Sequence, residues 1–387
     1  MFKGVDYYQI DSLLSEEEKM VQQTVRRFVQ DKFLPVVSEY HDKAEFPQQF
    51  IPQLGDLGLL GVTIPQQYGA AGLSHFIYGL AMQELERGDS GLRSFASVQG
   101  SLVMFPIFKY GSEAQKQFWL PKLASGEKIG CFGLTEPDHG SDPGGMLTTA
   151  KETADGWLLN GSKMWITNGS IADVAVVWAR TEKGISGFLV EKDTEGFAAN
   201  TIKGKYSLRA SITSELSFQD CLIPKENILP EAKGLKAPLS CLNEARYGIA
   251  WGAAGAAMAC YDEALNYAQS RIQFDKPIAG FQLVQHKLVE MVTEITKAQL
   301  LCYQLGRLKD EGKAGFNHVS LAKRNNVHQA LEIARSARSI LAANGITDEY
   351  QVIRHLLNLE SVYTYEGTHD IHTLIVGENI TGISAFR

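Results

Sequence analysis

The chain has 387 residues, enough for two or three domains, and its 44% hydrophobic and 21% charged residues are ordinary for a globular protein. Its formal net charge of -7, without a long basic run, argues against nucleic acid as the main partner, because phosphate binding needs clustered Lys and Arg. No run of about 18 consecutive apolar residues is present, so we expect no membrane span.

The cysteines and the N-terminal stretch bear on the cellular compartment. The cysteines are odd in number and form no CxxC pair, so we interpret them as reduced thiols of an intracellular protein. They stand at positions 131, 221, 241, 260 and 302. The stretch MFKGVDYYQIDSLLSEEEK has neither the apolar core of a signal peptide nor the Arg-rich, acid-poor composition of a transit peptide. We therefore expect a cytoplasmic protein, or a mitochondrial matrix protein if a presequence was removed before this numbering.

Helix signals dominate the first third of the chain. Ser15 followed by Glu18 forms a capping box, which predicts a helix start. Apolar residues then repeat at helical spacing on one face, at Val21, Val25, Phe28, Val29 and Phe33. Pro35 predicts that this helix ends nearby. A loop with several glycines is expected at 58–73. Two more helices are expected after it, at about 78–86 and 113–123.

Near residue 130 the pattern changes to short apolar runs separated by turn dipeptides. Asp155-Gly156 and Asn160-Gly161 are typical of tight hairpin turns. The apolar runs predict strands at 157–159, 174–179, 187–190 and 215–218. We expect a compact β domain of hairpins that ends near the Pro-rich stretch 223–230.

After about residue 236 the helical period resumes. Leu288, Met291, Ile295, Ala298 and Cys302 step by three or four along one face. Long helices with few prolines favour an antiparallel bundle. Because the order is helical, β, helical, we expect an α+β protein that is mostly α. Its domains are expected at 1–129, 130–235 and 236–387.

Two segments of the β region have features of a binding site for a flat ligand. Segment 131–145, CFGLTEPDHGSDPGG, is dense in Gly, Pro, Ser and Asp, so its backbone can approach a ligand closely and offer N–H groups to an anion. A surface loop explains this composition about as well. Segment 163–170, KMWITNGS, offers a Trp as an apolar plate and a Thr as a hydroxyl donor. Taken alone, it is more simply a strand that ends in an Asn-Gly turn.

Segment 365–372, YEGTHDIH, brings one acid and two histidines close together. Glu366 precedes a glycine, and a solvated helix-cap carboxylate is its simplest interpretation. His369 and His372 are three residues apart, as metal ligands on one helix face can be. No third ligand of obvious spacing accompanies them, so we predict no metal site.

Segment 86–101, ERGDSGLRSFASVQGS, contains Arg93 four residues after Asp89. One interpretation is an exposed i,i+4 ion pair, which contributes little to stability. The other is a guanidinium that binds a carboxylate or phosphate of a ligand.

Together, these segments resemble the acyl-CoA dehydrogenase family over essentially the whole chain. The resemblance rests on five motifs in order: GLLGVTIPQQYG, CFGLTEPDHGSD, KMWITN, RIQFDKPIAGFQLVQHKL and YEGTHDIH. Within the family, the chain looks most like the glutaryl-CoA dehydrogenases. That closer similarity rests on LRSFASVQGSLVMFPI, CLNEARYGIAWG, KRNN at 323–326 and TYEGTHDIH.

The resemblance implies a fold and a cofactor. The fold would be an N-terminal helical domain, a middle β-barrel and a C-terminal four-helix bundle, assembled as a homotetramer. FAD would lie between the β domain and the C-terminal helices. The positions that match FAD contacts are Phe132, Leu134, Thr135, Gly140, Ser141, Trp165, Ile166, Thr167, Leu341, Ala342, Ala343, Thr368 and Asp370. Those that match contacts to the FAD of a neighbouring subunit are Arg271, Phe274 and Gln282.

One departure from the family pattern concerns this cofactor. The chain reads LAANG where the family commonly has paired glycines, so Ala342 and Ala343 add two methyl groups where backbone approaches the adenosine half of FAD. This puts the affinity for FAD in question, though not the chemistry.

Glu366 matches the family's catalytic base. The α-proton of a thioester is weakly acidic, so a carboxylate that removes it must be close and desolvated. Binding of an acyl chain would expel water and raise the basicity of this carboxylate. The family hydrogen-bonds the thioester oxygen through the backbone N–H at the Gly367 position and a flavin ribityl hydroxyl. A hydride then passes to the flavin, and two electrons pass on to an electron-transfer flavoprotein.

The resemblance also implies contacts to CoA and to the acyl chain. Positions that match CoA contacts are Ser141, Leu242, Asn243 and Arg246; an ion pair with Glu244 is the other interpretation of Arg246. Arg93 and Ser94 match positions that bind the distal carboxylate of glutaryl-CoA, and Glu86 matches a second pocket carboxylate. A buried unpaired charge is strongly penalised, so an Arg in an acyl pocket implies a substrate with a distal anion.

Tyr365 matches the residue found in decarboxylating members. The implied reaction oxidises glutaryl-CoA to glutaconyl-CoA, which loses carbon dioxide through a dienolate, and Glu366 returns a proton to give crotonyl-CoA. Two alternatives stay open. One is a short-chain acyl-CoA dehydrogenase or oxidase without decarboxylation, and the other is a non-enzymatic helical scaffold.

Overall fold

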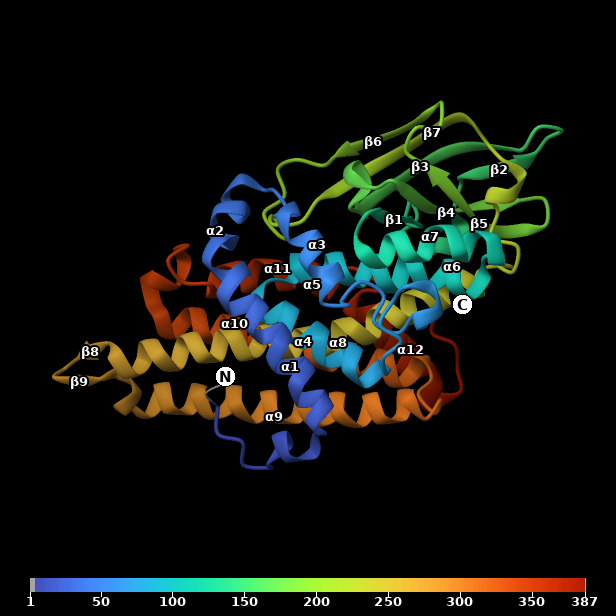
Figure 1. Cartoon of the computed structure of the whole chain (residues 1–387). Helices are drawn as coiled ribbons and strands as arrows, with labels where there is room; N and C mark the ends of the chain where they lie inside the picture. The colour runs from blue at the N-terminus through green and yellow to red at the C-terminus, as the bar shows by residue number, and fades with distance from the viewer. Residues whose placement is uncertain (1–3, 387) are drawn as a thin grey trace.

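The computed structural model describes residues 4–386, and most of them lie in helices, with a β-sheet at one end of the helical body (Figure 1). The helices of the N-terminal part are α1 (Glu16–Phe28), α2 (Leu34–Lys43), α3 (Ile51–Asp56), α4 (His75–Gly88), α5 (Ser90–Ser97), α6 (Phe105–Tyr110) and α7 (Glu113–Ser125). Two π-helical segments, Val29–Phe33 and Val98–Met104, connect α1 to α2 and α5 to α6.

The predicted start of α1 is confirmed, but its predicted end is wrong. The Glu18 backbone N–H donates to Ser15 Oγ at 3.3 Å, and the Ser15 N–H donates to Glu18 Oε2 at 2.8 Å. The π-helical segment Val29–Phe33 carries the helical path into α2. Pro35 follows directly on this π-helical segment, so it lies within a continuous helical path and not at its end. The helix therefore continues past the proline.

The sheet is built from the strands that follow α7. They are β1 (Gly130–Gly133), β2 (Thr149–Glu152), β3 (Trp157–Thr167), β4 (Val174–Thr181), β5 (Gly184–Glu191), β6 (Phe197–Thr201) and β7 (Thr213–Ile223). Their order in the sheet is β1-β4-β2-β3-β7-β6, and β5 pairs with β4. Each of the four predicted apolar runs lies within one of these strands.

The two predicted hairpin turns have different outcomes. At Asp155-Gly156 the chain does reverse between the antiparallel strands β2 and β3, with the Thr153 N–H donating to the Gly156 carbonyl at 2.8 Å. The predicted turn at Asn160-Gly161 is wrong, because β3 runs straight through it. Gly161 has a φ of +142° and lies at a shift in register between β3 and β7. The glycine there serves a β-bulge rather than a turn.

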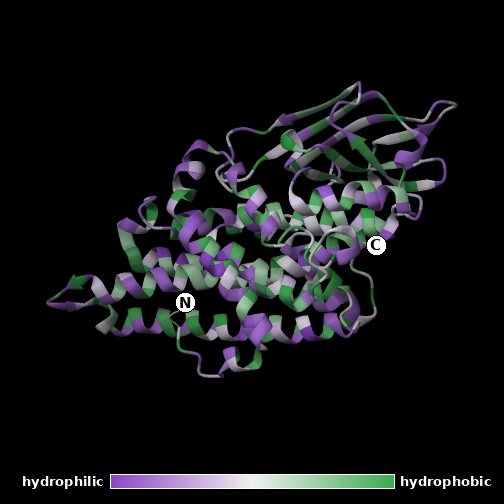
Figure 2. Cartoon of the chain, in the orientation of Figure 1, coloured by the Kyte–Doolittle hydropathy of each residue, from purple (hydrophilic) through white to green (hydrophobic). Residues whose placement is uncertain are grey.

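The C-terminal part is a helical bundle. Its helices are α8 (Lys236–Ser270), α9 (Gln282–Asp310), α10 (Phe316–Leu341), α11 (Val352–Thr364) and α12 (His369–Thr381). All five apolar residues of the predicted face of α9 are buried, and hydrophobic and hydrophilic residues alternate along this outer helix (Figure 2). A hairpin of β8 (Ile272–Gln273) and β9 (Lys276–Pro277) joins α8 to α9 and projects beyond the helices at the end opposite the sheet (Figure 1). The bundle was expected to have four helices, and α12 adds a further one after a break at residues 365–368.

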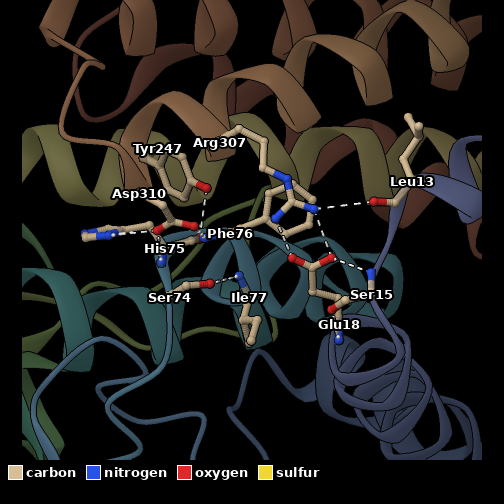
Figure 3. A network of polar contacts seen from close by, with 10 residues as sticks. All are labelled: Leu13, Ser15, Glu18, Ser74, His75, Phe76, Ile77, Tyr247, Arg307 and Asp310. Atoms are coloured by element: carbon tan, nitrogen blue, oxygen red, sulfur yellow. Dashed lines mark hydrogen bonds and ion pairs between the residues drawn. The ribbon is translucent and has the colours of Figure 1, made fainter.

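A polar network fixes the N-terminal helices to α9 (Figure 3). Arg307 donates to both carboxylate oxygens of Glu18, at 2.5 and 3.0 Å. Asp310 accepts the backbone N–H groups of His75 and Phe76 at the start of α4, at 2.7 and 3.2 Å. Since a helix start exposes unpaired N–H groups, Asp310 acts as a cap supplied by another helix. The network therefore holds α4, which carries Glu86, against the bundle.

The five predicted free thiols are confirmed, and all of them are buried. Within residues 4–386, no helix combines enough length and hydrophobicity to cross a membrane. The proposed domain boundaries fall immediately before β1 and immediately before α8.

Candidate active site

The candidate base lies on the short loop that separates α11 from α12. Tyr365 ends α11 in an extended conformation. Glu366 and Gly367 then take φ angles of +52° and +89°, in the left-handed region. Thr368 caps α12 by accepting the backbone N–H of Ile371 at 3.1 Å. A non-glycine residue at positive φ is strained, which is a recurrent feature of functional sites.

Two buried cations hold the carbonyl groups of this loop. Lys323, from α10, donates to the carbonyls of Tyr365, Glu366 and Gly367; the last two distances are 3.3 and 2.7 Å. Arg246, from α8, donates through Nε to the same Glu366 carbonyl at 2.7 Å. The loop is therefore fixed from two helices of the bundle. The alternative pairing of Arg246 with Glu244 is wrong, because Glu244 pairs with Lys309.

The carboxylate of Glu366 is free to act. Its Oε2 atom is buried and has no hydrogen-bond partner among the described residues. Burial raises the pKa of this carboxyl, while the charges of Lys323, Arg93 and Arg246 partly offset that rise. The interpretation as a solvated cap is therefore wrong. A desolvated carboxylate with no protein partner has the properties required of a general base.

Arg93 lies in a second buried cluster next to this loop. Its Nε donates to Glu86 Oε2 at 2.6 Å, and its Nη2 donates to the Tyr365 hydroxyl. The Tyr365 hydroxyl also lies 3.3 Å from Ser94 Oγ. Arg93 is 1% exposed and Glu86 is fully buried. Burial alone would lower the pKa of Arg93, but Glu86 and Tyr365 more than offset this and raise it.

A glycine of α8 makes room for this ion pair. A Cβ atom at Gly252 would lie 1.9 Å from Glu86 Oε2 and 3.2 Å from Arg93 Nε. The pair therefore packs directly against the α8 backbone, and a larger residue at this position would displace it.

Asp89 does not pair with Arg93, so that alternative is wrong. Instead it caps α5, accepting the Gly91 N–H at 2.7 Å. Its other oxygen accepts from Arg354 Nε at 3.0 Å and from Asn358 Nδ2 at 2.8 Å, both on α11. This buried contact ties the start of α5, which carries Arg93, to the helix that ends at Tyr365. It fixes the two halves of the site relative to each other.

Known proteins share this architecture along its whole length. Family models match in order: acyl-CoA dehydrogenase N-terminal domain at 15–127, middle domain at 131–221 and C-terminal domain at 232–381. The chain is 38% identical over 373 residues to short-chain specific acyl-CoA dehydrogenase, mitochondrial, from Homo sapiens, which covers 95% of this chain and 90% of that protein. The chain belongs to the acyl-CoA dehydrogenase family.

Two solved structures of this family are especially similar. A glutaryl-CoA dehydrogenase from Mycobacterium smegmatis is 57% identical with a TM-score of 0.97, over 99% of each chain. A glutaryl-CoA dehydrogenase from the same organism, in complex with FADH2, is 51% identical with a TM-score of 0.98, over 100% of each chain. The expected family and fold are confirmed, and the chain is an FAD-dependent acyl-CoA dehydrogenase.

The residues expected at FAD fit such a ligand at the β domain. Trp165 is 61% exposed at a φ of +64°, so a large aromatic plate is held at the surface by a strained backbone. Thr135 and Thr167 are half-buried, and an added Cβ at Gly140 would meet no atom within 4 Å. Phe132, Leu134 and Ile166 are buried, so their side chains belong to the core beneath this surface.

A buried ion pair holds the loop that contains Thr135. Lys163 donates to Glu136 Oε1 at 2.8 Å and to the Leu134 carbonyl at 3.1 Å. Glu136 also accepts the backbone N–H groups of Leu147 and Thr148, at 2.6 and 2.9 Å. The pair therefore joins both ends of the segment expected to hold the flavin ring.

The other expected FAD contacts lie elsewhere in the fold. Arg271, Phe274 and Gln282 are exposed around the projecting hairpin, where Phe274 is 87% exposed. Ala342 follows α10 at a φ of +53°, a conformation that suits glycine. Of its neighbours, Leu341 is buried and Ala343 is exposed. Thr368 caps α12, and Asp370 is exposed in its first turn.

Three of the residues expected at CoA lie on α8, the helix whose Arg246 bonds to the 365–367 loop. Ser141 is exposed on the β domain, and Leu242 and Asn243 are half-buried. Asn243 Oδ1 is buried without a partner among the described residues, so this acceptor is available to a ligand. Arg246 is 9% exposed and bonded to the loop, which restricts any further contact to its terminal nitrogens.

The two histidines of the YEGTHDIH segment take different surroundings. His372 is buried, and burial together with Lys323 and Arg246 lowers its pKa to about 2. The ring of His369 stacks on Tyr363, with centroids 4.6 Å apart. Within residues 4–386, no group of three or more potential metal ligands is found.

Lys323 and Lys163 had no predicted role, although they lie in the KRNN and KMWITN motifs. A signal for Lys323 was present. It stands four residues after Val319 and four before Val327, on the apolar stripe of α10 where a charge is unexpected. Lys163 is in phase with the buried residues Trp157 and Leu159 of β3, at an inward-facing position where a charge is equally unexpected.

Proposed function

We propose that this enzyme converts glutaryl-CoA to crotonyl-CoA and carbon dioxide. The observation that carries the proposal is the buried Glu86–Arg93–Tyr365 cluster beside Glu366. Glu86 and Tyr365 use the Nε and Nη2 groups of Arg93, so an apolar acyl chain would leave the Nη1 donors without an acceptor. A distal carboxylate at the far end of the substrate would accept from them.

Arg93 is arranged to receive a carboxylate. Its Nε and Nη2 groups are bonded to Glu86 and Tyr365, while Nη1 donates to no described residue. Ser94 and the Tyr365 hydroxyl, 3.3 Å apart, supply further donors beside it. Burial raises the pKa of Tyr365 to about 12, so this hydroxyl keeps its proton at neutral pH. Charge-assisted hydrogen bonds of this kind contribute about 1.5–3 kcal/mol each.

Glu366 removes the α-proton of the thioester in this proposal, and the Gly367 N–H stabilises the negative charge that develops on the thioester oxygen. Bound FAD supplies the acceptor for the β-hydride. The resulting glutaconyl-CoA loses carbon dioxide, and the electron pair of the broken C–C bond forms a dienolate. Protonation of that dienolate by Glu366 gives crotonyl-CoA, so the proton taken in the first step is returned in the last.

The assembly and the electron acceptor are part of the proposal. The exposed hairpin around Phe274 supports a homotetramer in which Arg271, Phe274 and Gln282 reach the FAD of a neighbouring subunit. Two large apolar side chains, Ile272 and Phe274, are exposed near each other on this hairpin, and contiguous exposed apolar surface marks an interaction site. The acceptor of the two electrons is expected to be an electron-transfer flavoprotein.

A short-chain acyl-CoA dehydrogenase is the second candidate, because the human relative bears that description. The test compares kcat/KM for glutaryl-CoA and butyryl-CoA in the unmodified protein and in the double variant Glu86→Gln/Arg93→Met. The double variant removes both charges together, so neither is left buried alone. Our proposal predicts that glutaryl-CoA loses about 100-fold and butyryl-CoA much less. Equal use of both substrates before and after the change would support the second candidate, and rapid peroxide formation in air would indicate an oxidase.

A further inference from the structure

Lys323 is a buried cation whose hydrogen bonds all go to backbone oxygens. It is 2% exposed, and within residues 4–386 no carboxylate lies within ion-pair distance of its Nζ atom. Lysines are rarely buried to this extent unless they are paired with a carboxylate. Its acceptors are instead the consecutive carbonyls of Tyr365, Glu366 and Gly367.

The three acceptors require the ammonium form. An ammonium has three N–H donors, whereas a neutral amine has two and a lone pair that would face a carbonyl oxygen. Burial lowers the pKa of Lys323 well below its ordinary value, and the charge of Glu366 acts in the opposite direction. The three carbonyls follow directly on the C-terminus of α11, where the helix dipole also favours a cation.

The hold on the Glu366 carbonyl also determines the direction of a neighbouring N–H group. A trans peptide unit is planar, with its C=O and N–H pointing in opposite directions, and the described chain contains no cis peptide bond. Lys323 and Arg246 both bond to the Glu366 carbonyl. The Gly367 N–H of the same peptide unit therefore points away from both cations.

The loop needs such a restraint. Glu366 at a φ of +52° is in a conformation that costs about 1–3 kcal/mol for a non-glycine residue. Gly367 has no room for a side chain, since a Cβ would lie 2.9 Å from His372 Nε2 and 3.1 Å from Arg246 Nη2. Without the cations, the 366–367 peptide unit would be free to rotate, and the Gly367 N–H would lose its fixed direction.

We propose that Lys323 is a positioning residue for the reaction, because it holds residues 365–367 so that the Gly367 N–H and the Glu366 carboxylate face the thioester together. The inference rests on the proposed function, since it assigns Glu366 as the base. Loss of Lys323 is expected to slow proton removal, while the CoA contacts on Ser141 and Asn243 remain. The rate falls and the affinity does not.

The test uses the flavin-loaded protein with Lys323→Met and, as a matched control, Arg324→Met. Arg324 is the next residue of the same motif and donates to Thr373 at the surface, at 2.7 Å. The measurements are the dissociation constant of glutaryl-CoA and the rate of flavin reduction at saturating glutaryl-CoA without oxygen. We expect about 100-fold slower reduction in Lys323→Met, as a misplaced base produces, with an affinity within about threefold of the unmodified protein. Arg324→Met should match the unmodified protein in both.

The pH dependence of the reduction rate gives a second measurement. The groups that act on Glu366 are Lys323, Arg93, Arg246, Tyr365 and Tyr78. The guanidinium groups stay charged and the phenols stay neutral near neutral pH, and His372, with its pKa of about 2, stays neutral as well. Removing the Lys323 charge raises the pKa of Glu366, so the acidic limb should move to higher pH in Lys323→Met only.

Each outcome is decisive. If Lys323→Met does not retain flavin, Lys323→Gln, which keeps two N–H donors, is measured in its place. Reduction as fast as in Arg324→Met would overturn the inference, and so would a loss of affinity as large as the loss of rate. If the unmodified protein binds glutaryl-CoA but its flavin is not reduced, the proposed function fails and the inference fails with it. If the unmodified protein reduces its flavin with glutaryl-CoA and Lys323→Met does so equally fast, the inference is wrong and the proposed function stands.

Discussion

Two buried lysines hold backbone on either side of this active site, and they differ in what balances their charge. Lys163 in the β domain is fully buried and bonded to the carboxylate of Glu136. Lys323 in the bundle is 2% exposed and bonded to carbonyl oxygens. The first supports the segment expected to hold the flavin, and the second supports the loop that carries the proposed base, Glu366.

The two lysines therefore differ in how strongly their charge acts on neighbouring groups. A buried ion pair is electrically neutral, so Lys163 and Glu136 have little effect on groups around them. Lys323 leaves a positive charge beside Glu366, which limits the rise in the pKa of that carboxyl. A carboxylate bonded directly to Lys323 would remove that influence. The catalytic loop thus gains a cation and keeps its carboxylate free.

Breaking the neutral pair should have the largest effect on stability. Glu136→Ala leaves Lys163 buried without a partner, which typically costs 3–5 kcal/mol, and we expect a loss of about that size in the free energy of unfolding. Chemical denaturation monitored by circular dichroism measures it. The control is Glu136→Gln/Lys163→Met, which removes both charges and should restore most of the loss. A double variant as unstable as Glu136→Ala would contradict the account.

The pH dependence of stability sharpens the same comparison. Burial would raise the pKa of Glu136, but hydrogen bonds from Lys163, Thr148 and Leu147 lower it to about 2. Because this lies below the ordinary value of 4.5, the stabilisation is complete above pH 4.5 and is lost as the pH falls toward 2. Glu136→Gln should flatten the decline in unfolding free energy between pH 4.5 and 3. The exposed control Glu152→Gln should leave the decline unchanged.

On the alkaline side, Lys163 also makes the stability rise with pH. Burial lowers the pKa of Lys163 to about 8, against an ordinary 10.5. Between these values the unfolded chain binds more protons than the folded one, so the stability contributed by this residue rises with pH. Lys163→Met in the Glu136→Gln background should remove that rise. If the stability of this double variant still rose with pH, another group would be the cause.

The smallest effect is expected at a strained residue that has no cation to hold it. Ala342 has a φ of +53°, nearly the same as Glu366 at +52°. Ala342→Gly should relieve strain and raise the free energy of unfolding by about 1 kcal/mol. Ala343, which lacks a positive φ, is the control, and Ala343→Gly should lower it by roughly 0.5–1 kcal/mol. Equal effects of the two substitutions would show that the backbone angle is not the cause.

The order of helical and β regions followed from periodicity, because burial of one face imposes a period of 3.6 or 2 on the sequence. Local rules failed where a neighbouring element changed the outcome. A π-helical turn let the chain pass Pro35 without stopping, and a bulge opposite β7 used Gly161 within a strand.

The site was harder to predict than the fold. Glu366 and Arg93 were assigned through family resemblance, and spacing alone favoured a solvated cap and a pair with Asp89. Arg93 in fact pairs with Glu86 and contacts Tyr365, which is 272 residues away. Contacts over such distances depend on how α4, α5 and α11 pack, which no local pattern encodes.

The central claim is that Glu366 removes a proton from glutaryl-CoA and that decarboxylation follows. The most direct measurement mixes FAD-loaded protein with glutaryl-CoA in the absence of oxygen, with an artificial electron acceptor for repeated turnover. The unmodified protein should lose its flavin absorbance and release carbon dioxide with crotonyl-CoA. Glu366→Gln should bind glutaryl-CoA yet do neither. Bleaching by Glu366→Gln at a rate near that of the unmodified protein would contradict the assignment of the base, and bleaching without carbon dioxide would contradict the decarboxylation.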